Sequence, residues 1–151
     1  MEREKYFEAT EFTNIKELIQ DAVSKYKEKT AFVIKHKEEK MVSYEEVSYT
    51  RLLEEVNQLG TKFYDLGYQE KRVAIVGRNC YQWALAHLTN LLGGILSIPL
   101  DKELQVEELE SCLVRSKADV LVFDEKYIQN IEEIKKRGNA KIENYICMTK
   151  Q

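Results

Sequence analysis

Residues 72–100 read RVAIVGRNCYQWALAHLTNLLGGILSIPL, and this stretch decides the fold. Arg78 is the only Asp, Glu, Lys or Arg between Val73 and Leu100, although these four residue types make up 32% of the chain. A segment so poor in charge is expected to be buried on most sides. The stretch divides into a strand at 72–76, a turn at 77–79, a helix at about 81–92, a turn at 93–94 and a strand at 95–98. This is a βαβ unit, whose parallel strands are normally covered on both faces.

The alternation of helix and strand continues toward the C-terminus. Apolar residues at helical or strand spacing predict a helix at about 106–116, a strand at 119–123, a helix at 127–137 and a last strand at 141–148. Successive βα steps of this kind predict an α/β fold, with a mainly parallel sheet flanked by helices on both faces.

Toward the N-terminus the pattern predicts a helix, a small β-hairpin and a second helix. The first helix begins after Thr13 and runs to about Glu28, and strands at 30–35 and 41–43 form the hairpin. The run Ser43-Tyr44-Glu45-Glu46 is a capping box that is expected to open a helix ending at Gly67. We expect residues 1–12 to be a poorly ordered leader and residues 13–151 to form one α/β subdomain.

Composition excludes several classes of protein. With 23 basic and 26 acidic residues the net charge is -3, which does not indicate a nucleic-acid partner. No run of about 20 apolar residues predicts a membrane span. The three cysteines form no CxxC motif, so we expect reduced thiols in a cytoplasmic protein rather than disulfides or zinc ligands.

The turn Gly77-Arg78-Asn79 is the one candidate for ligand binding. The six glycines fit neither GxGxxG nor GxxxxGK[ST], but this turn lies between a strand and a helix, where backbone N–H groups can hold an anion. The favoured interpretation is a tight βα turn, with Asn79 capping the helix and Arg78 in solvent.

No catalytic residue or metal site is predicted. His36 falls in the polar hairpin turn, His87 shares a helix face with Trp83, and Cys80 has no base placed beside it. No group of His, Cys, Asp or Glu has metal-ligand spacing. The acidic residues at 107–110 and the basic residues at 135–137 are expected to be solvated helix ends.

Several motifs, taken in order, resemble the AMP-forming acyl-CoA synthetases of the adenylate-forming superfamily. They are Thr30-Ala31-Phe32, Ser43-Tyr44-Glu45-Glu46-Val47, RVAIVGRNCYQW at 72–83, GGILSIPLD at 93–101, Glu107-Glu108-Leu109 and SKADV at 116–120. The resemblance runs from about Phe12 to Met148. Residues 79–83 and 99–104 are most similar to bacterial long-chain fatty acid–CoA ligases. Gly60 departs from the pattern, because an alanine is more usual there.

The resemblance implies the N-terminal part of a ligase that joins a carboxylate to ATP and passes the acyl group to coenzyme A. The family's phosphate loop, its ribose-binding acidic residue and its C-terminal lysine have no counterpart in this chain. ATP, Mg²⁺, coenzyme A and a fatty acid are therefore expected to bind the full enzyme, and no cofactor is expected in this chain. The remainder of the ligase is its expected partner. An exposed sheet edge and apolar face should make the isolated chain self-associate.

Two other hypotheses stay open at this stage. The chain would be a stand-alone, non-catalytic binding module on the same scaffold, or a flavodoxin-like nucleotide binder. The second hypothesis predicts that the isolated chain binds ATP or FMN.

Overall fold

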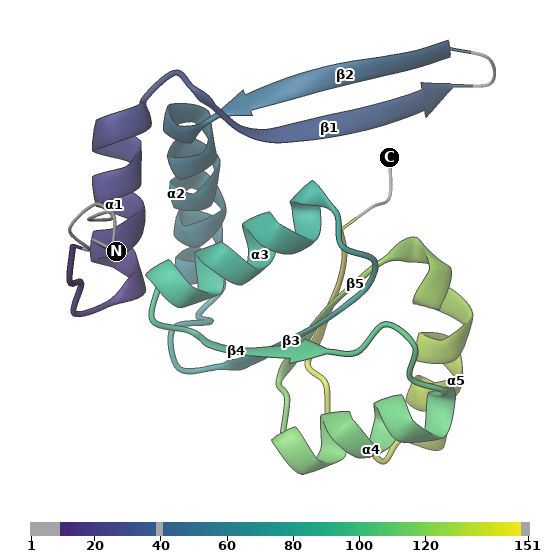
Figure 1. Cartoon of the computed structure of the whole chain (residues 1–151). Coiled ribbons are helices and arrows are strands. Elements are labelled where there is room, and N and C mark those ends of the chain that lie inside the picture. Colours follow the sequence, from purple (N-terminus) through teal and green to yellow (C-terminus); the bar gives the residue numbers. More distant parts are fainter. Residues whose placement is uncertain (1–9, 39–40, 149–151) are drawn as a thin grey trace, which may run out of the picture.

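The computed structural model describes residues 10–38 and 41–148 (Figure 1). Most of the leader expected over residues 1–12 therefore lies outside the described residues. The elements, in chain order, are α1 (Ile15–Tyr26), β1 (Thr30–Glu38), β2 (Met41–Ser48), α2 (Tyr49–Asp65), β3 (Arg72–Val76), α3 (Tyr81–Leu92), β4 (Leu96–Leu100), α4 (Val106–Ser116), β5 (Val120–Phe123), a 3₁₀ turn (Glu125–Tyr127), α5 (Ile128–Arg137) and β6 (Asn144–Cys147).

The main sheet is parallel, with the strand order β4-β3-β5-β6. β1 and β2 form a separate antiparallel hairpin. The predicted α/β class is confirmed, and so are the predicted bounds of β3, α3 and α4. Pro99 lies in β4, which is an edge strand. Proline has no N–H to donate to a sheet, and it is tolerated in edge strands because only one of their sides pairs with another strand.

Each face of the central strands builds its own core. Ala74 and Val76 of β3 point toward α4 and α5, whereas Val73 and Ile75 point toward α2 and α3. All four side chains are fully buried. Helices consequently cover the sheet on both faces (Figure 1), as the charge-poor sequence predicts.

A third core cluster joins the hairpin to the helices. Val47 of β2, Leu52 and Val56 of α2 and Tyr81 of α3 are buried together, and Phe32 packs against them from β1. The rings of Phe32 and Tyr81 meet edge to face, with centroids 5.3 Å apart. The base of the hairpin is thereby fixed, while the rest of it projects from the body (Figure 1).

The capping box predicted at Ser43 is wrong. Residues 43–46 instead continue β2, where Ser43 pairs with His36 and Glu46 with Val33. The helix begins at Tyr49, five residues later than a cap at Ser43 would place its start. The side chain of Ser48 caps it by accepting a hydrogen bond from the Arg51 N–H at 3.2 Å. Pairing with β1 outweighs the local capping signal, because the ladder satisfies backbone groups along the whole segment.

The N-terminal cap of α1 is Asn14 rather than Thr13. The Asn14 side chain accepts the Glu17 N–H at 2.9 Å, while Thr13 bonds the Glu17 carboxylate. At the end of α2, Gly67 has a φ of +75°, so the predicted glycine stop is confirmed.

Gly60 lies inside α2, and a side chain has room there. A Cβ at this position would have Thr89 Cγ2 as its nearest neighbour, at 3.8 Å, an ordinary van der Waals distance. We predict that Gly60→Ala raises the free energy of unfolding by about 1 kcal/mol, because alanine is the better helix former. Urea denaturation measures the change. Gly67→Ala is the matched control: its positive φ should make the same substitution destabilising by about 1 to 2 kcal/mol. A loss of stability in Gly60→Ala would contradict the prediction.

Candidate functional site

The carboxyl ends of β3 and β5 lie side by side, where the strand order of the sheet reverses. β3 connects through α3 to β4 on one side, and the chain then returns through α4 to β5 on the other. In open parallel sheets, ligands bind in the crevice outside such a switch point. The turn Gly77-Arg78-Asn79 follows β3 at this position, and Asp124 follows β5.

An ion pair occupies the switch point. The Arg78 Nε lies 2.9 Å from the Asp124 Oδ2, and Asp124 is almost completely buried. The Asp124 side chain also accepts the Lys126 N–H at 3.3 Å, which caps the 3₁₀ turn. Arg78 therefore balances a buried carboxylate, although more than half of its side chain is exposed.

Residue 77 has no room for a side chain larger than that of glycine. A Cβ added at Gly77 would lie 2.9 Å from the Asp124 Cβ and would also collide with the Met148 methyl group. Asn79 is not the cap of α3: Cys80 holds that position, without a side-chain hydrogen bond. Arg78, the one cation of the turn, already pairs with the buried Asp124. The turn therefore offers no free cation to the phosphates of ATP.

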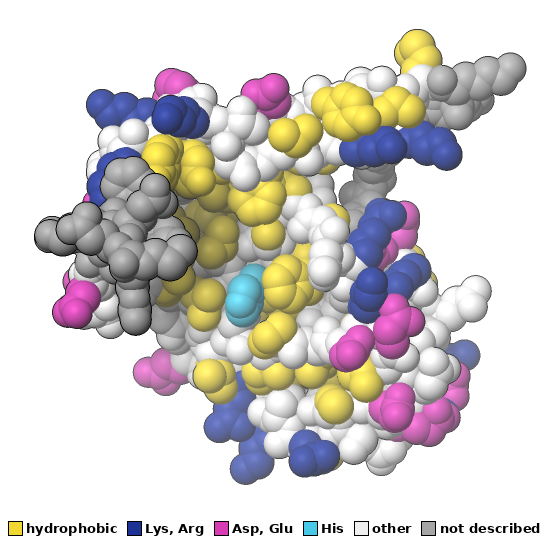
Figure 2. Space-filling view, in the orientation of Figure 1, with side chains coloured by type: hydrophobic (Ala, Val, Ile, Leu, Met, Phe, Trp, Pro, Cys, Tyr) yellow, Lys and Arg dark blue, Asp and Glu magenta, His cyan; other side chains and the backbone are white. Residues whose placement is uncertain are grey.

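A cleft of about 1060 Å³ opens beside the switch point, between β1 and the start of α3. We call it the β1–α3 cleft; its lining residues are Phe32, Val33, Ile34, Lys35, His36, Lys37, Arg78, Asn79, Cys80, Tyr81, Gln82, Trp83, Ala84 and Met148. Figure 2 shows the hairpin standing away from the body, with Lys and Arg side chains along the hairpin and on the surface that faces it. The lining includes three basic residues and no acidic residue.

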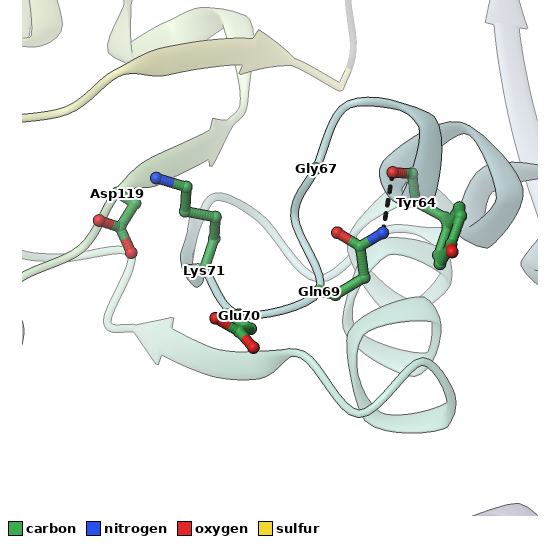
Figure 3. A pocket seen from close by; sticks show the side chains of 6 residues that line it. All are labelled: Tyr64, Gly67, Gln69, Glu70, Lys71 and Asp119. Atoms are coloured by element: carbon green, nitrogen blue, oxygen red, sulfur yellow. Dashed lines mark hydrogen bonds between the residues drawn. The ribbon is translucent and has the colours of Figure 1, made fainter.

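A second, smaller pocket of about 560 Å³ lies near the opposite end of the sheet (Figure 3). Three of its polar side chains already have partners. Lys71 pairs with Glu143 at 2.9 Å, Asp119 accepts the Arg72 N–H at 2.8 Å, and the Gln69 amide donates to the Tyr64 carbonyl at 3.1 Å. Strand beginnings border this pocket, so it is a poor place for a ligand that needs free polar groups.

The two histidines lie on different elements, His36 on β1 and His87 on α3. The His87 ring packs against Trp83, with centroids 5.1 Å apart, and its Nδ1 lies 2.9 Å from the Ser97 Oγ. Burial lowers the pKa of His87, so the imidazole is neutral at pH 7. His36 belongs to β1 rather than to the hairpin turn, and it lies 3.0 Å from Glu45.

The sequence predicted that the acidic start of α4 and the basic end of α5 are separate, solvated helix ends. The structure instead joins them. Arg137 contacts Glu107 at 2.8 Å and the largely buried Glu110 at 3.1 Å, and it also contacts Glu133. Hydrogen bonds from Arg137 lower the pKa of Glu107. These ion pairs fasten α4 to α5.

Within the described residues, no group of three or more His, Cys, Asp and Glu side chains is arranged to hold a metal ion. The helices in that part of the chain are too short or too polar to cross a membrane. Cys80, Cys112 and Cys147 are free and half-buried.

Comparison with known proteins places the fold. A model of the family described as AMP-binding enzyme matches residues 19–149. The chain is similar to the anthranilate CoA ligase AuaEII in complex with anthranoyl-AMP, with a TM-score of 0.74 and 20% identity over 89% of this chain and 24% of that chain. It is also similar to the inhibitor-bound N-terminal domain of FACL13 from Mycobacterium tuberculosis, with a TM-score of 0.77 and 16% identity over 90% of this chain and 33% of that one.

A third similar structure is the long-chain-fatty-acid-CoA ligase FadD1 from Archaeoglobus fulgidus. Its TM-score is 0.72, and its identity is 19% over 92% of this chain and 28% of that chain. At these identities the likeness concerns the fold alone. The chain spans about a quarter to a third of the length of these structures. A comparison with curated proteins gave no match.

The close packing around Gly77 gives a testable consequence. Gly77→Ala should lower the free energy of unfolding by about 1 to 3 kcal/mol, because the added methyl group displaces Asp124 and Met148 from a filled site. Urea denaturation measures the change, and Gly60→Ala is the control, because it carries the same chemical change where the nearest neighbour lies at an ordinary van der Waals distance. Equal or greater stability in Gly77→Ala would contradict the close packing of Gly77 against Asp124 and Met148.

Proposed function

The chain belongs to the family of AMP-binding enzymes, and we propose that it is the N-terminal part of an AMP-forming ligase that converts a fatty acid to its CoA thioester. The reaction joins the carboxylate to the α-phosphate of ATP, with release of pyrophosphate, and the thiol of coenzyme A then displaces AMP from the acyl-adenylate. The family match over residues 19–149 carries the proposal. The motifs at 79–83 and 99–104 support a fatty acid as the substrate.

In this proposal, residues 13–151 form an incomplete α/β subdomain that acts as a scaffold. At the switch point of the sheet, Arg78 is engaged by Asp124, and no described residue there is placed as a nucleophile beside a base. ATP, Mg²⁺, coenzyme A and the fatty acid would bind residues outside this chain. Because Arg78 already pairs with Asp124, the switch point also lacks a free cation for a flavodoxin-like nucleotide binder, whose ligand would bind there.

The partner of this scaffold is the remainder of the ligase. One surface that it would cover is the outer hairpin face, which we define as Val33, Val42 and Tyr44. The strand register puts these three residues on one side of the hairpin, together with Lys35, Lys37 and Glu46. All three apolar side chains are exposed. A cytoplasmic location is part of the proposal, because the cysteines are free thiols.

The adenylation activity is tested on the natural protein and on this chain side by side. An antibody raised against the chain should detect a natural protein several times heavier than 17.8 kDa. That protein should catalyse ATP–pyrophosphate exchange that depends on a fatty acid, whereas the isolated chain at equal molar concentration should not. Benzoate and anthranilate serve as control carboxylates. Exchange by the isolated chain would overturn its role as a scaffold, and a natural protein that exchanges with no fatty acid would overturn the proposed reaction.

The outer hairpin face should make the isolated chain self-associate. Light scattering over a range of concentrations should show dimers or larger species, and Tyr44→Lys should shift them toward monomer, because a charge then replaces an apolar contact. Tyr64→Lys is the matched control: Tyr64 is 67% exposed and Tyr44 is 65% exposed, but Tyr64 lies on α2. A monomer at all concentrations that binds no hydrophobic dye would contradict the prediction.

A further inference from the structure

Three polar side chains join α3 to the edge strand β4. The His87 Nδ1 lies 2.9 Å from the Ser97 Oγ, and the Asn90 Nδ2 donates to the same oxygen at 3.2 Å. His87 and Asn90 are three residues apart on α3 and therefore share a helix face. Asn90 is fully buried, and His87 and Ser97 are half-buried. We call these three residues the α3–β4 cluster.

The hydrogen bonds of the cluster fix where its protons lie. An amide NH₂ group can only donate, so the Ser97 oxygen accepts from Asn90 and its own proton is left to donate to His87. Among the described residues, the Ser97 side chain has no third hydrogen-bond partner. His87 therefore accepts at Nδ1 and carries its proton on Nε2, as a neutral imidazole.

No carboxylate is placed to balance a positive charge on His87. α3 and β4 contain no Asp, Glu, Lys or Arg. α1, α2, β3, β1 and the turn after β3 lie against α3, and their charged or imidazole side chains are Lys16, Glu17, Asp21, Lys25, Lys35, His36, Lys37, Glu38, Arg51, Glu54, Glu55, Lys62, Asp65, Arg72 and Arg78. Burial lowers the pKa of His87, and no charged group adds to that shift. A protonated ring would thus hold an uncompensated charge in a partly buried position, which is unfavourable.

β4 is the strand that such a charge would loosen. Within the described residues it pairs with β3 alone. None of its five residues is fully buried, whereas four of the five in β3 and all four in β5 are buried. Segments with few buried apolar contacts open at a lower free energy than core strands do. The bonds from Ser97 to His87 and Asn90 tie β4 to α3.

We propose that the α3–β4 cluster is a proton-sensitive latch, which holds β4 against α3 while His87 is neutral and releases β4 when His87 takes up a proton. In the charged ring Nδ1 becomes a donor, so the Ser97 oxygen faces two donors and the Ser97 proton loses its acceptor. Turning the Asn90 amide over would offer Oδ1 to that proton, but it would leave a buried NH₂ group without an acceptor. The latch goes beyond the proposed ligase function and does not depend on it.

The direction of the pH dependence follows from the position of His87. A histidine whose pKa is lower in the folded protein than in the unfolded one contributes stability above its ordinary pKa of 6.5, and this contribution is lost as the pH falls below that value. Histidine is the side chain whose ordinary pKa lies between about pH 5 and pH 8. The chain has two histidines, and the other, His36, lies in the hairpin. Release of β4 under mild acid is therefore assigned to His87.

Nuclear magnetic resonance of the ring nitrogens tests the state of His87. In the isotope-labelled chain at about pH 8, the His87 ring should be the Nε2–H tautomer with an unprotonated Nδ1. On acidification the ring should take up its proton with a midpoint below 6.5. An Nδ1–H tautomer, or a midpoint above 6.5, would overturn the latch.

Amide hydrogen exchange measures the release of β4. Protection factors, corrected for the intrinsic pH dependence of exchange, should fall by about threefold or more between about pH 8 and about pH 5.5 for the β4 amides that bond β3. The amides of β5 should stay within about 1.5-fold, because that strand is buried on both faces. Unchanged protection of β4, or an equal fall in both strands, would contradict a local release.

Two histidine variants identify the group that responds. His87→Gln keeps an oxygen that accepts the Ser97 proton but does not titrate, so the protection of β4 should stay within about 1.5-fold over the same pH range. The matched control His36→Gln should keep the full fall of the unmodified chain. A fall that persists in His87→Gln would assign the pH dependence to another group. If His87→Gln does not fold, the tautomer and titration of the unmodified ring decide the question.

A serine variant tests the bond itself. Ser97→Ala removes the bond to His87 and leaves the histidine in place, so the protection of β4 at about pH 8 should fall by about threefold, as acid does in the unmodified chain. Ser116→Ala is the control, because Ser116 is also half-buried but lies on α4 and bonds the Leu113 carbonyl. Equal protection of β4 in Ser97→Ala and in the unmodified chain would show that this bond does not hold the strand.

Discussion

Burial of β3 on both faces is the constraint on which the rest of this structure depends. Val73, Ala74, Ile75 and Val76 are each fully buried, and β5 is buried almost as completely. Burying one such aliphatic side chain contributes roughly 1.5 to 3 kcal/mol, so a strand that is apolar on both faces strongly favours helices on both faces. β3 lies between β4 and β5, and the reversal of strand order at β3 creates the switch point.

The sequence predicts these central elements well, because their signals are local. Few charges mark the buried strands, helical spacing marks the helices, and Gly67 and Gly138 end two of them at positive φ. The bounds of β3, α3 and α4 agree with the prediction to the residue. The predicted start of α2 was wrong because its signal is not local. The residues that keep Ser43 in a strand are those of β1, and a local capping pattern contains no information about that pairing.

The candidate site, too, was predicted only where its signals are local. The turn Gly77-Arg78-Asn79 could be located from the strand before it and the helix after it, and the structure has it between β3 and α3. What fills it could not be inferred, because Asp124 and Met148 come from segments far along the chain. One signal did exist: Asp124 directly follows a predicted buried strand, and parallel strands bring their carboxyl ends together. The β1–α3 cleft had no such signal, since its walls come from a hairpin and a helix that meet only in the folded chain.

A chain of polar contacts holds the hairpin over that cleft. The Tyr81 hydroxyl donates to Glu55 at 2.8 Å, Arg51 joins Glu55 and Glu45 at 2.6 Å each, and Glu45 reaches His36. Burial, with the bond to Glu55, raises the pKa of Tyr81, so the phenol keeps its proton and remains a donor. Hydrogen bonds from Arg51 and His36 lower the pKa of Glu45, which keeps this carboxylate charged.

Exposed ion pairs of this kind add little stability one by one. Their effect here is geometric, because they run from the buried Tyr81 out along β2 to β1. The apolar residues of β1 anchor the base of the hairpin, and the ion pairs fix the direction in which it leaves the body. Lys35 and Lys37 take no part in this chain of contacts. The position of the hairpin over the β1–α3 cleft is therefore set by its buried apolar base and by this line of contacts, and it does not depend on the charges of Lys35 and Lys37.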